Sequence, residues 1–257
     1  MNNKKPKVIL LVAGEGKRLH PYTLDRPKCM VEVDGISLID RQLSILRSQG
    51  LDNIIMIGGY KSEMLKGKVE KLIHNPKYYN TNMVTTLFCA EDELEGEIIV
   101  SYGDIVYSKN ILKSLMKSSA DISVTIDKNW KSYWRKRYPD PLLDAETLKL
   151  DSEGYITQIG QKPKSLDEIE GQYMGLMKFS NVGLRQIKEV FYKALNDDKI
   201  LTKPINNAYI TDLLQAVINS GKKIQSVPIY DNWVEIDTIK DLKSKHTILR
   251  LKLISEN

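Results

Sequence analysis

The segment VILLVAGEGKRLHPYTLDRPKCM, residues 8–30, decides the fold class of this chain. It begins with the apolar run VILLVAG (8–14) and continues with a second glycine and with basic residues placed around two prolines. An apolar run this short predicts a strand that is buried on both faces, as in a parallel sheet. Glycines after such a strand let the backbone approach a ligand, with N–H groups able to face phosphate oxygens.

Two well-known phosphate-binding loops do not fit the spacing of this segment. A dinucleotide-binding loop requires a third glycine three positions after the second, but Leu19 stands there. An ATPase loop requires Ser or Thr after its Gly-Lys pair, whereas Gly16-Lys17 is followed by Arg18. The remaining interpretation is a loop in which Arg18 offers a forked donor to phosphate and Lys28 offers a compact positive charge.

Apolar runs of similar length recur along the first half of the chain. They read NIIMIGG (53–59), EIIVSYGD (97–104) and DISVTID (121–127), with amphipathic segments between them. Strands that alternate with helices predict an α/β fold with a Rossmann-like, doubly wound mixed sheet. From about 130 to 180 the pattern changes to strands without intervening helices, which predicts a smaller antiparallel subregion. The aromatic residues at its start are expected in a partly apolar loop.

Composition says more about the expected location and partners of the protein than about its activity. The chain has 38 Lys and Arg against 33 Asp and Glu, spread without an arginine-rich tract, so nucleic acid is not the expected partner. Cys29 and Cys89 form neither a CxxC pair nor a disulfide framework, which favours a reducing, cytoplasmic location. No apolar run approaches the length of a membrane span, so no membrane partner is expected.

The loop as a whole resembles the signature of the nucleotidylyltransferases that act on sugar phosphates and related small phosphates. That signature reads (L/V)-x-A-G-x-G-x-R-(L/M), followed by Pro, Thr and a Pro-Lys pair. Its elements stand in this chain as Val12, Ala13, Gly14, Gly16, Arg18, Leu19, Pro21, Thr23, Pro27 and Lys28. The resemblance implies a fold of the nucleotidyltransferase and glycosyltransferase-A type. It also implies transfer of a nucleotidyl group from a nucleoside triphosphate to a phosphorylated acceptor, with release of pyrophosphate.

Later segments resemble further parts of the same family. SYGD (101–104) and WVEID (233–237) resemble the two segments that supply metal-binding acids, which implies that Asp104 and Asp237 bind Mg²⁺. IGQKP (159–163) resembles a segment whose lysine contacts the acceptor phosphate, which adds Lys162 to Arg18 and Lys28 as catalytic residues. The residues expected at the nucleotide are Val12, Ala13, Gly14, Glu15, Gly16, Lys17, Gly59, Tyr60, Asn82, Thr85, Tyr102 and Gly103.

The region from Trp130 to Lys149 resembles the cytidylyltransferase branch that acts on phosphocholine, aminoethylphosphonate or phosphorylated glutamine. The resemblance implies CTP and a small phosphate or phosphonate acceptor. The residues expected at the acceptor are Trp130, Trp134, Arg137, Asp144, Glu146, Lys162, Glu170 and Tyr173. Rings and carboxylates in this region could surround an ammonium, whereas Arg135 or Arg137 could bind a carboxylate, so the residues do not select one acceptor.

On this interpretation residues 1–257 form a single nucleotidyltransferase domain. Approximately 1–127 make a nucleotide-binding half and approximately 128–237 an acceptor-binding half, and 238–257 make a C-terminal helix. The alternatives left open are a sugar-1-phosphate nucleotidylyltransferase that uses UTP or dTTP and a non-catalytic nucleotide-binding module. A glycosyltransferase would normally show an acid pair spaced D-x-D, where this chain has the single acid Asp104. The oligomeric state is open between a monomer and a homodimer.

Overall fold

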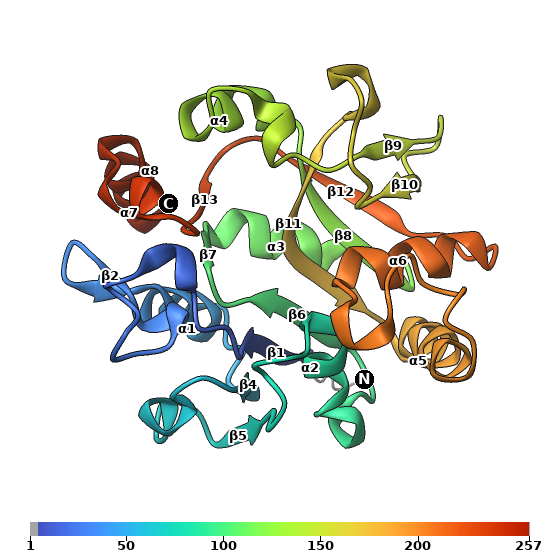
Figure 1. The fold of residues 1–257 in the computed structure, drawn as a ribbon, viewed down its shortest axis with the longest axis horizontal. Helices are drawn as coiled ribbons and strands as arrows, with labels where there is room; N and C mark the ends of the chain where they lie inside the picture. The colour runs from blue at the N-terminus through green and yellow to red at the C-terminus, as the bar shows by residue number, and fades with distance from the viewer. Residues whose placement is uncertain (1–4, 257) are drawn as a thin grey trace. The chain divides into compact units, whose positions relative to one another are not determined.

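The computed structural model describes residues 5–256, which fall into two compact units (Figure 1). Unit 1 comprises Met1–Asn80, Thr86–Lys113 and Asn232–Asn257, and unit 2 comprises Thr81–Thr85 and Ser114–Asp231. The main part of unit 2 is therefore an insertion in the chain of unit 1. Helices α2 (Met83–Phe88) and α3 (Lys109–Lys117) each contain a point at which the chain passes from one unit to the other.

Unit 1 is built on four parallel strands in the order β6-β1-β4-β5. These strands are β1 (Lys7–Val12), β4 (Ile54–Gly58), β5 (Lys71–His74) and β6 (Ile98–Tyr102). The two central strands are almost wholly buried, as their uninterrupted apolar runs predict. The predicted parallel sheet is confirmed, and the carboxyl ends of its strands meet at one edge, where ligands bind in open α/β sheets.

Helix α1 (Leu38–Ser48) follows the short hairpin β2 (Glu32–Val33) and β3 (Ile36–Ser37) in unit 1. Its N-terminus is capped by Ser37, whose hydroxyl accepts a hydrogen bond from the Asp40 N–H at 3.1 Å. The apolar stripe that includes Ile39, Leu43 and Leu46 is buried. Gln42 lies on the same buried face and is completely enclosed.

A small antiparallel ladder joins two distant parts of the unit 1 chain. Strand β7 (Ile105–Tyr107) pairs with β13 (Trp233–Glu235), so that Val106 lies opposite Val234. The C-terminal segment beyond β13 forms two helices, α7 (Ile239–Lys243) and α8 (Lys245–Glu256), which meet at Ser244. Thr238 and Asp241 form a capping box at the start of α7, which fixes the path of the chain directly after β13.

Unit 2 contains a three-stranded mixed sheet in the order β12-β8-β11. Strand β8 (Ile122–Asp127) pairs parallel with β12 (Gln225–Ile229) and antiparallel with β11 (Gln172–Phe179). A separate antiparallel pair is formed by β9 (Leu148–Leu150) and β10 (Ile156–Ile159). The unit also contains the helices α5 (Asn181–Asn196) and α6 (Ile210–Asn219). These pairings confirm the predicted mixed sheet with an antiparallel subregion.

The expectation of a loop for the aromatic residues after β8 is wrong. They form helix α4 (Trp130–Arg137), and the change to strands without helices does not hold for this stretch. Its buried residues are Trp130, Tyr133, Trp134 and Arg137, spaced as one helical face. The prediction failed because an arginine takes one of the four inward positions, so that the stripe is not read as apolar.

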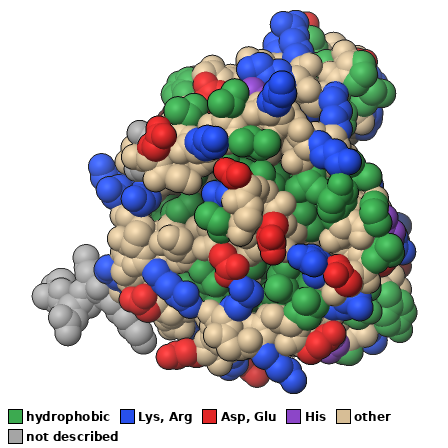
Figure 2. Space-filling view, turned by 90° about the vertical axis from the view of Figure 1, so that its left-hand side faces the viewer, with side chains coloured by type: hydrophobic (Ala, Val, Ile, Leu, Met, Phe, Trp, Pro, Cys, Tyr) green, Lys and Arg blue, Asp and Glu red, His purple; other side chains and the backbone are tan. Residues whose placement is uncertain are grey.

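The surface of the described residues carries both signs of charge. On the face in Figure 2, Lys and Arg side chains are interspersed with Asp and Glu side chains and with apolar ones. Within residues 5–256 no helix combines the length and the apolar character that crossing a membrane requires.

Candidate functional site

The glycine loop after β1 folds back on itself and brings Lys28 against Gly16. The Thr23 hydroxyl donates to the Gly16 carbonyl at 2.9 Å, and the Lys28 N–H donates to the Gly14 carbonyl at 3.3 Å. Gly16 has a φ of +71°, and a Cβ placed there would lie 2.9 Å from Cβ and Cγ of Lys28. Glycine is therefore required at position 16 both by the backbone conformation and by the passage of the lysine side chain.

The carboxyl ends of the parallel strands carry several predicted nucleotide-binding residues, among them Val12, Ala13, Gly59, Tyr60 and Gly103. The Tyr60 N–H donates to the Ala13 carbonyl at 3.0 Å, and a Cβ at Gly59 would lie 2.8 Å from that same oxygen. Gly103 follows β6, and its N–H donates to the Leu11 carbonyl of β1 at 3.0 Å. A Cβ at Gly103 would collide with Val12, so this glycine also allows a close approach of two chain segments.

The two predicted metal-binding acids lie at the same end of the small ladder, beside the pair Ile105 and Glu235. Asp104 directly precedes β7, and Asp237 follows β13 by one residue. The Ile236 N–H donates to the Asp104 carbonyl at 3.0 Å, which extends the contact of the two strands to the acids themselves. Thr238, not Asp237, is the N-cap of α7, so the Asp237 carboxylate is available for other contacts.

Lys28 connects the two carboxylates. Its Nζ lies 2.5 Å from Oδ2 of Asp104 and 2.7 Å from Oδ1 of Asp237, and all three side chains are mostly buried. Arg18, whose side chain is largely exposed, forms an ion pair with the other oxygen of Asp237. We call these four residues the acid–lysine cluster.

The charges of the acid–lysine cluster control the protonation of its lysine. Burial lowers the pKa of the Lys28 ammonium, but the charges and hydrogen bonds of Asp104 and Asp237 outweigh it and hold the pKa well above its ordinary value of 10.5. The neighbouring Cys29 is also buried, and burial raises the pKa of its thiol to about 12. Lys28 is therefore a permanent cation at neutral pH, whereas Cys29 is a neutral thiol.

The donor set of the acid–lysine cluster fits a Mg²⁺ ion that is shared with a nucleotide. Oδ1 of Asp104 is buried and has no hydrogen-bond partner, which leaves an oxygen available to a cation. Within residues 5–256, no group of three or more His, Cys, Asp and Glu side chains could hold a metal ion by itself. Mg²⁺ is usually held by one or two carboxylates together with substrate phosphates, so two acids suffice.

The remaining residues predicted at the nucleotide are spread over both units. In unit 1, Glu15 lies 3.6 Å from the Lys17 ammonium, and Tyr102 contributes its carbonyl to a hydrogen bond with Gln42. In unit 2, the Asn82 side chain accepts from the N–H of Met83, the first residue of α2. The Thr85 hydroxyl, also in unit 2, donates to the carbonyl of Ile205 at 3.4 Å. Their nucleotide-binding roles stay predictions.

Three predicted acceptor residues of unit 2 lie together around helix α4. The Arg137 guanidinium lies 5.2 Å from the ring centroid of Trp134 and 5.4 Å from that of Tyr133. The Tyr138 ring is a third neighbour at 5.2 Å. Asp144 accepts a hydrogen bond from Nε1 of Trp134 at 3.1 Å. In this arrangement, which we call the ring–arginine cluster, the cation beside the rings is the protein's own Arg137.

The other predicted acceptor residues lie along the same part of unit 2. Trp130 contacts Trp134 edge to face, with ring centroids 6.3 Å apart. The ammonium of Lys162 donates to the Leu142 carbonyl, two residues before Asp144. Further contacts are made by Glu146, whose N–H donates to Gln172; by Glu170, whose Oε1 accepts from the Leu150 N–H; and by Tyr173, whose hydroxyl contacts the Met177 sulfur.

Sequence reasoning missed two residues at these clusters. Tyr133 belongs to the ring–arginine cluster, and its position one turn before Arg137 would have indicated this once a helix was assumed. Gln42 is fully buried on α1 and contacts the turn that carries Asp104. The sequence could have indicated the importance of Gln42, because this polar residue shares a helical face with the apolar residues Ile39, Leu43 and Leu46.

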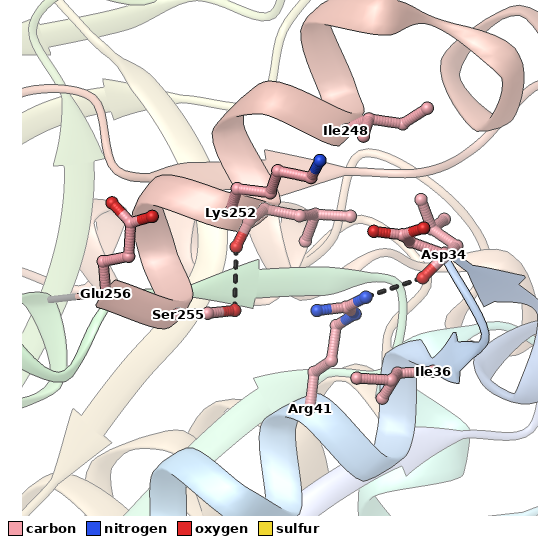
Figure 3. Close-up of a pocket in the computed structure, with 9 residues that line it drawn as sticks. Asp34, Ile36, Arg41, Ile248, Lys252, Ser255 and Glu256 are labelled. Atoms are coloured by element: carbon pink, nitrogen blue, oxygen red, sulfur yellow. Dashed lines mark hydrogen bonds between the residues drawn. The ribbon is translucent and has the colours of Figure 1, made fainter.

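A cavity of about 270 Å³ lies elsewhere in unit 1, between the β2–β3 hairpin, α1 and α8 (Figure 3). Arg41 points toward it from α1 and donates to the Val33 carbonyl at 2.6 Å, while Lys252 and Glu256 line it from α8. None of the predicted site residues lines this cavity.

Comparison with known proteins identifies the family of this chain. Residues 8–150 match the model of the MobA-like NTP transferase domain. The CTP:phosphoglutamine cytidylyltransferase of Campylobacter jejuni is 41% identical over 247 residues, which are 91% of this chain and 97% of the relative. The choline-phosphate cytidylyltransferase of Streptococcus pneumoniae is 33% identical over 122 residues, 46% of this chain and 53% of the relative.

Solved structures agree on the fold. The inositol-1-phosphate CTP transferase from T. maritima superposes with a TM-score of 0.74, covering 96% of this chain and 95% of its own, at 21% identity. The predicted family, its fold class and its enzymatic nature are thereby confirmed. With a glycine loop, a lysine and two acids at the strand ends, the chain belongs to the MobA-like NTP transferases and is a nucleotidyltransferase.

Proposed function

We propose that this enzyme transfers a cytidylyl group from CTP to the phosphate of phosphorylated glutamine and releases pyrophosphate. The observation that carries the proposal is the 41% identity to a CTP:phosphoglutamine cytidylyltransferase, which extends over nearly all of both chains. Phosphocholine and aminoethylphosphonate, the other acceptors of this branch, are the competing substrates. Cys29 and Cys89 form no disulfide bond, which supports a reducing, cytoplasmic setting for the reaction.

The proposed reaction is an in-line displacement at the α-phosphorus of CTP. An oxygen of the acceptor phosphate forms the new P–O bond, while the bond to the β-phosphate breaks and pyrophosphate leaves. Because the enzyme forms no bond of its own, it acts by positioning the reactants and by neutralising their charge. Lys28, a permanent cation, and the exposed Arg18 are proposed to hold the triphosphate and the departing pyrophosphate.

Asp104 and Asp237 are proposed to hold Mg²⁺ together with the triphosphate. The unpartnered Oδ1 of Asp104 and the presence of both acids at one lysine support this assignment. When bound, the ion would neutralise phosphate charge and orient the α-phosphate. The carboxylates carry two negative charges, and Lys28 and Arg18 carry two positive ones, so the cluster is balanced before either ligand arrives. We infer that the phosphates of the nucleotide draw Lys28 and Arg18 away from the acids, which would leave the carboxylates of Asp104 and Asp237 able to hold the ion.

Acceptor binding is assigned to unit 2. The Lys162 ammonium has three N–H donors and uses one on the Leu142 carbonyl, so it can also contact the acceptor phosphate. Of the two arginines considered for an acceptor carboxylate, Arg135 is exposed, whereas Arg137 is buried against rings. We therefore assign the carboxylate of phosphorylated glutamine to Arg135 and a supporting role to Arg137. A carboxylate contact of this kind favours an amino-acid phosphate over phosphocholine, which has no carboxylate.

The test is a matrix of substrates with pyrophosphate release as the readout. Each of CTP, UTP, dTTP and ATP is incubated with Mg²⁺ and one of phosphorylated glutamine, phosphocholine, aminoethylphosphonate or a hexose 1-phosphate. We expect the highest kcat/KM for CTP with phosphorylated glutamine. The Asp104→Asn variant is the matched control for contaminating activity.

Other outcomes of the matrix select the alternatives. Release only with UTP or dTTP and a hexose 1-phosphate would identify a sugar-1-phosphate nucleotidylyltransferase. Nucleotide binding without release for every pair would identify a non-catalytic module. Preference for phosphocholine would retain the cytidylyl transfer but overturn the assigned acceptor.

A further inference from the structure

We propose that Gln42 is a positioning residue for the reaction, because it holds the turn that presents Asp104. Gln42 touches neither substrate nor metal in this proposal and acts through the backbone on either side of the aspartate. The inference rests on the proposed metal-binding role of Asp104.

The side chain of Gln42 forms hydrogen bonds with residues on both sides of that turn. Its Nε2 donates to the Tyr102 carbonyl at 2.8 Å and to the Ile105 carbonyl at 2.5 Å. Its Oε1 accepts from the Ser101 hydroxyl at 3.2 Å. The orientation of the amide follows from its partners, because two carbonyls require N–H donors and a hydroxyl can supply one. One side chain therefore spans the turn from Tyr102 to Ile105, with Asp104 inside it.

The turn is held from two further directions by the backbone. The Gly103 N–H donates to Leu11 of β1, and the Asp104 carbonyl accepts from the Ile236 N–H beside Asp237. These contacts fix the turn to the parallel strands and to the second acid, while Gln42 fixes it to α1. Since two of the three attachments involve only backbone groups, Gln42 is the attachment that a substitution can remove.

Burial of a side chain in the core does not by itself explain why residue 42 is a glutamine. Gln42 is completely enclosed and shares its helical face with Ile39, Leu43 and Leu46. A leucine or methionine would fill the same space and would bury no polar group. The amide is instead matched by three hydrogen bonds, all of which end within the chain segment Ser101–Ile105. Its specific contribution is therefore the geometry of that segment.

The test compares Gln42→Met with Leu46→Ala. Methionine keeps the length of glutamine but has no N–H donor, so the two carbonyls lose their partner and the Asp104 turn loosens. We expect kcat to fall about 100-fold, the effect of a shift of about 1 Å in a catalytic group, with the KM for CTP within about twofold of the wild-type value. The Mg²⁺ concentration at half-maximal rate should rise, and Mn²⁺ should bind more weakly by EPR in the presence of a non-hydrolysable CTP analogue.

Leu46→Ala controls for loss of stability, since it removes a fully buried side chain one turn further along the same helix. It should lower the Tm without changing the metal dependence. Gln42→Asn, which keeps the amide on a shorter stem, should lie between wild type and Gln42→Met in metal affinity and keeps the test available if the methionine variant does not fold.

The outcomes separate this inference from the proposed function. If Gln42→Met lowers the Tm but leaves Mn²⁺ affinity and the Mg²⁺ dependence unchanged, Gln42 is structural and the inference is wrong. If Asp104→Asn retains full activity, the metal role of Asp104 fails, whatever Gln42 does. Loss of activity in Asp104→Asn together with loss of metal affinity in Gln42→Met supports both.

Discussion

Lys28, whose side chain is mostly buried, and Arg137, which is buried, are two cations with different partners. Lys28 lies between two carboxylates, and Arg137 lies among the rings of Tyr133, Trp134 and Tyr138. A carboxylate that holds a lysine can exchange it for another cation, because the attraction does not depend on the identity of the charge. A ring face that holds a planar guanidinium also packs against it, so Arg137 is part of the buried core of unit 2.

From this difference we expect the acid–lysine cluster to rearrange during turnover and the ring–arginine cluster to persist. In the first, ionic partners are separated when a triphosphate arrives. In the second, the cation orders the residues that surround it, among them Trp134 and its partner Asp144. Substitutions in the first cluster should therefore act on turnover, and substitutions in the second on stability and on acceptor affinity.

The largest effect is expected for Asp104→Asn. The amide keeps the shape of the side chain but removes one of the two charges proposed to hold Mg²⁺, so kcat should fall at least about 1,000-fold. Pyrophosphate release measures the loss, and circular dichroism checks that the fold remains. Turnover within tenfold of the wild-type rate would show that Asp104 does not hold the metal. It would also contradict the proposal that Lys28 exchanges with another cation at this carboxylate.

Lys28→Met should lower kcat about 100-fold, because a fixed positive charge is lost at the proposed leaving group. The same variant should bind Mn²⁺ more tightly than wild type in the absence of nucleotide, since the two acids are no longer neutralised by the lysine. Lys7→Met is the matched control, because Lys7 has the same exposed fraction and pairs with Glu93 at 2.6 Å within unit 1. Equal Mn²⁺ affinities in the wild type and Lys28→Met would contradict the exchange.

The pH dependence of stability offers a second measurement on Lys28. The pKa of its ammonium is raised in the folded state, so its contribution to the free energy of unfolding is fully present below the ordinary value of 10.5. That contribution should disappear as the pH rises above 10.5 through the raised pKa. The Tm difference between wild type and Lys28→Met should accordingly be constant from about pH 7 to about pH 10 and shrink beyond.

Arg137→Lys should reduce kcat/KM for the acceptor about tenfold and lower the Tm, because an ammonium keeps the charge but not the planar stacking. Arg135→Ala, at an exposed position on the same helix, should raise the KM for the acceptor with no change in Tm. Thermal unfolding and acceptor titrations measure both effects. An unchanged Tm in Arg137→Lys would show that the ring–arginine cluster is not part of the core.

Trp134→Phe should have the smallest effect. Phenylalanine keeps a ring beside Arg137 but cannot donate to Asp144, and a single neutral donor to a carboxylate contributes about 1–3 kcal/mol. We expect a Tm lower by a few degrees and a change in acceptor KM of less than about fivefold. Asp144→Ala, which removes the acceptor, should have a similar effect if the hydrogen bond is the only contribution of this aspartate.

Local patterns in the sequence were sufficient for much of the fold. The apolar runs before Gly14 and Gly103 predicted buried parallel strands, and these strands form and pair in parallel. The long loop motif was sufficient by itself to indicate the family. These features depend on a few neighbouring residues or on one strand, and the sequence reports them directly.

Features that depend on distant pairing were harder to predict. Nothing near Asp104 indicates that its turn is tied to Ile236, or that Gln42 bridges Tyr102 and Ile105. Helix α4 was missed for a different reason, since the side chain at the fourth inward position is Arg137, and its burial depends on ring contacts made only in three dimensions. A local pattern can mark such a residue as unusual, but it does not identify the distant partner that the residue contacts.

The ladder between β7 and β13 has a consequence for the synthesis of the enzyme on the ribosome. Asp104 is synthesised before the insertion that forms most of unit 2, and Asp237 only after it. A nascent chain therefore carries the glycine loop, Lys28 and one acid long before the second acid exists, and the lysine has only half of its eventual counter-charge. If both acids act as proposed, the site is complete only after β13 has been synthesised and has paired with β7.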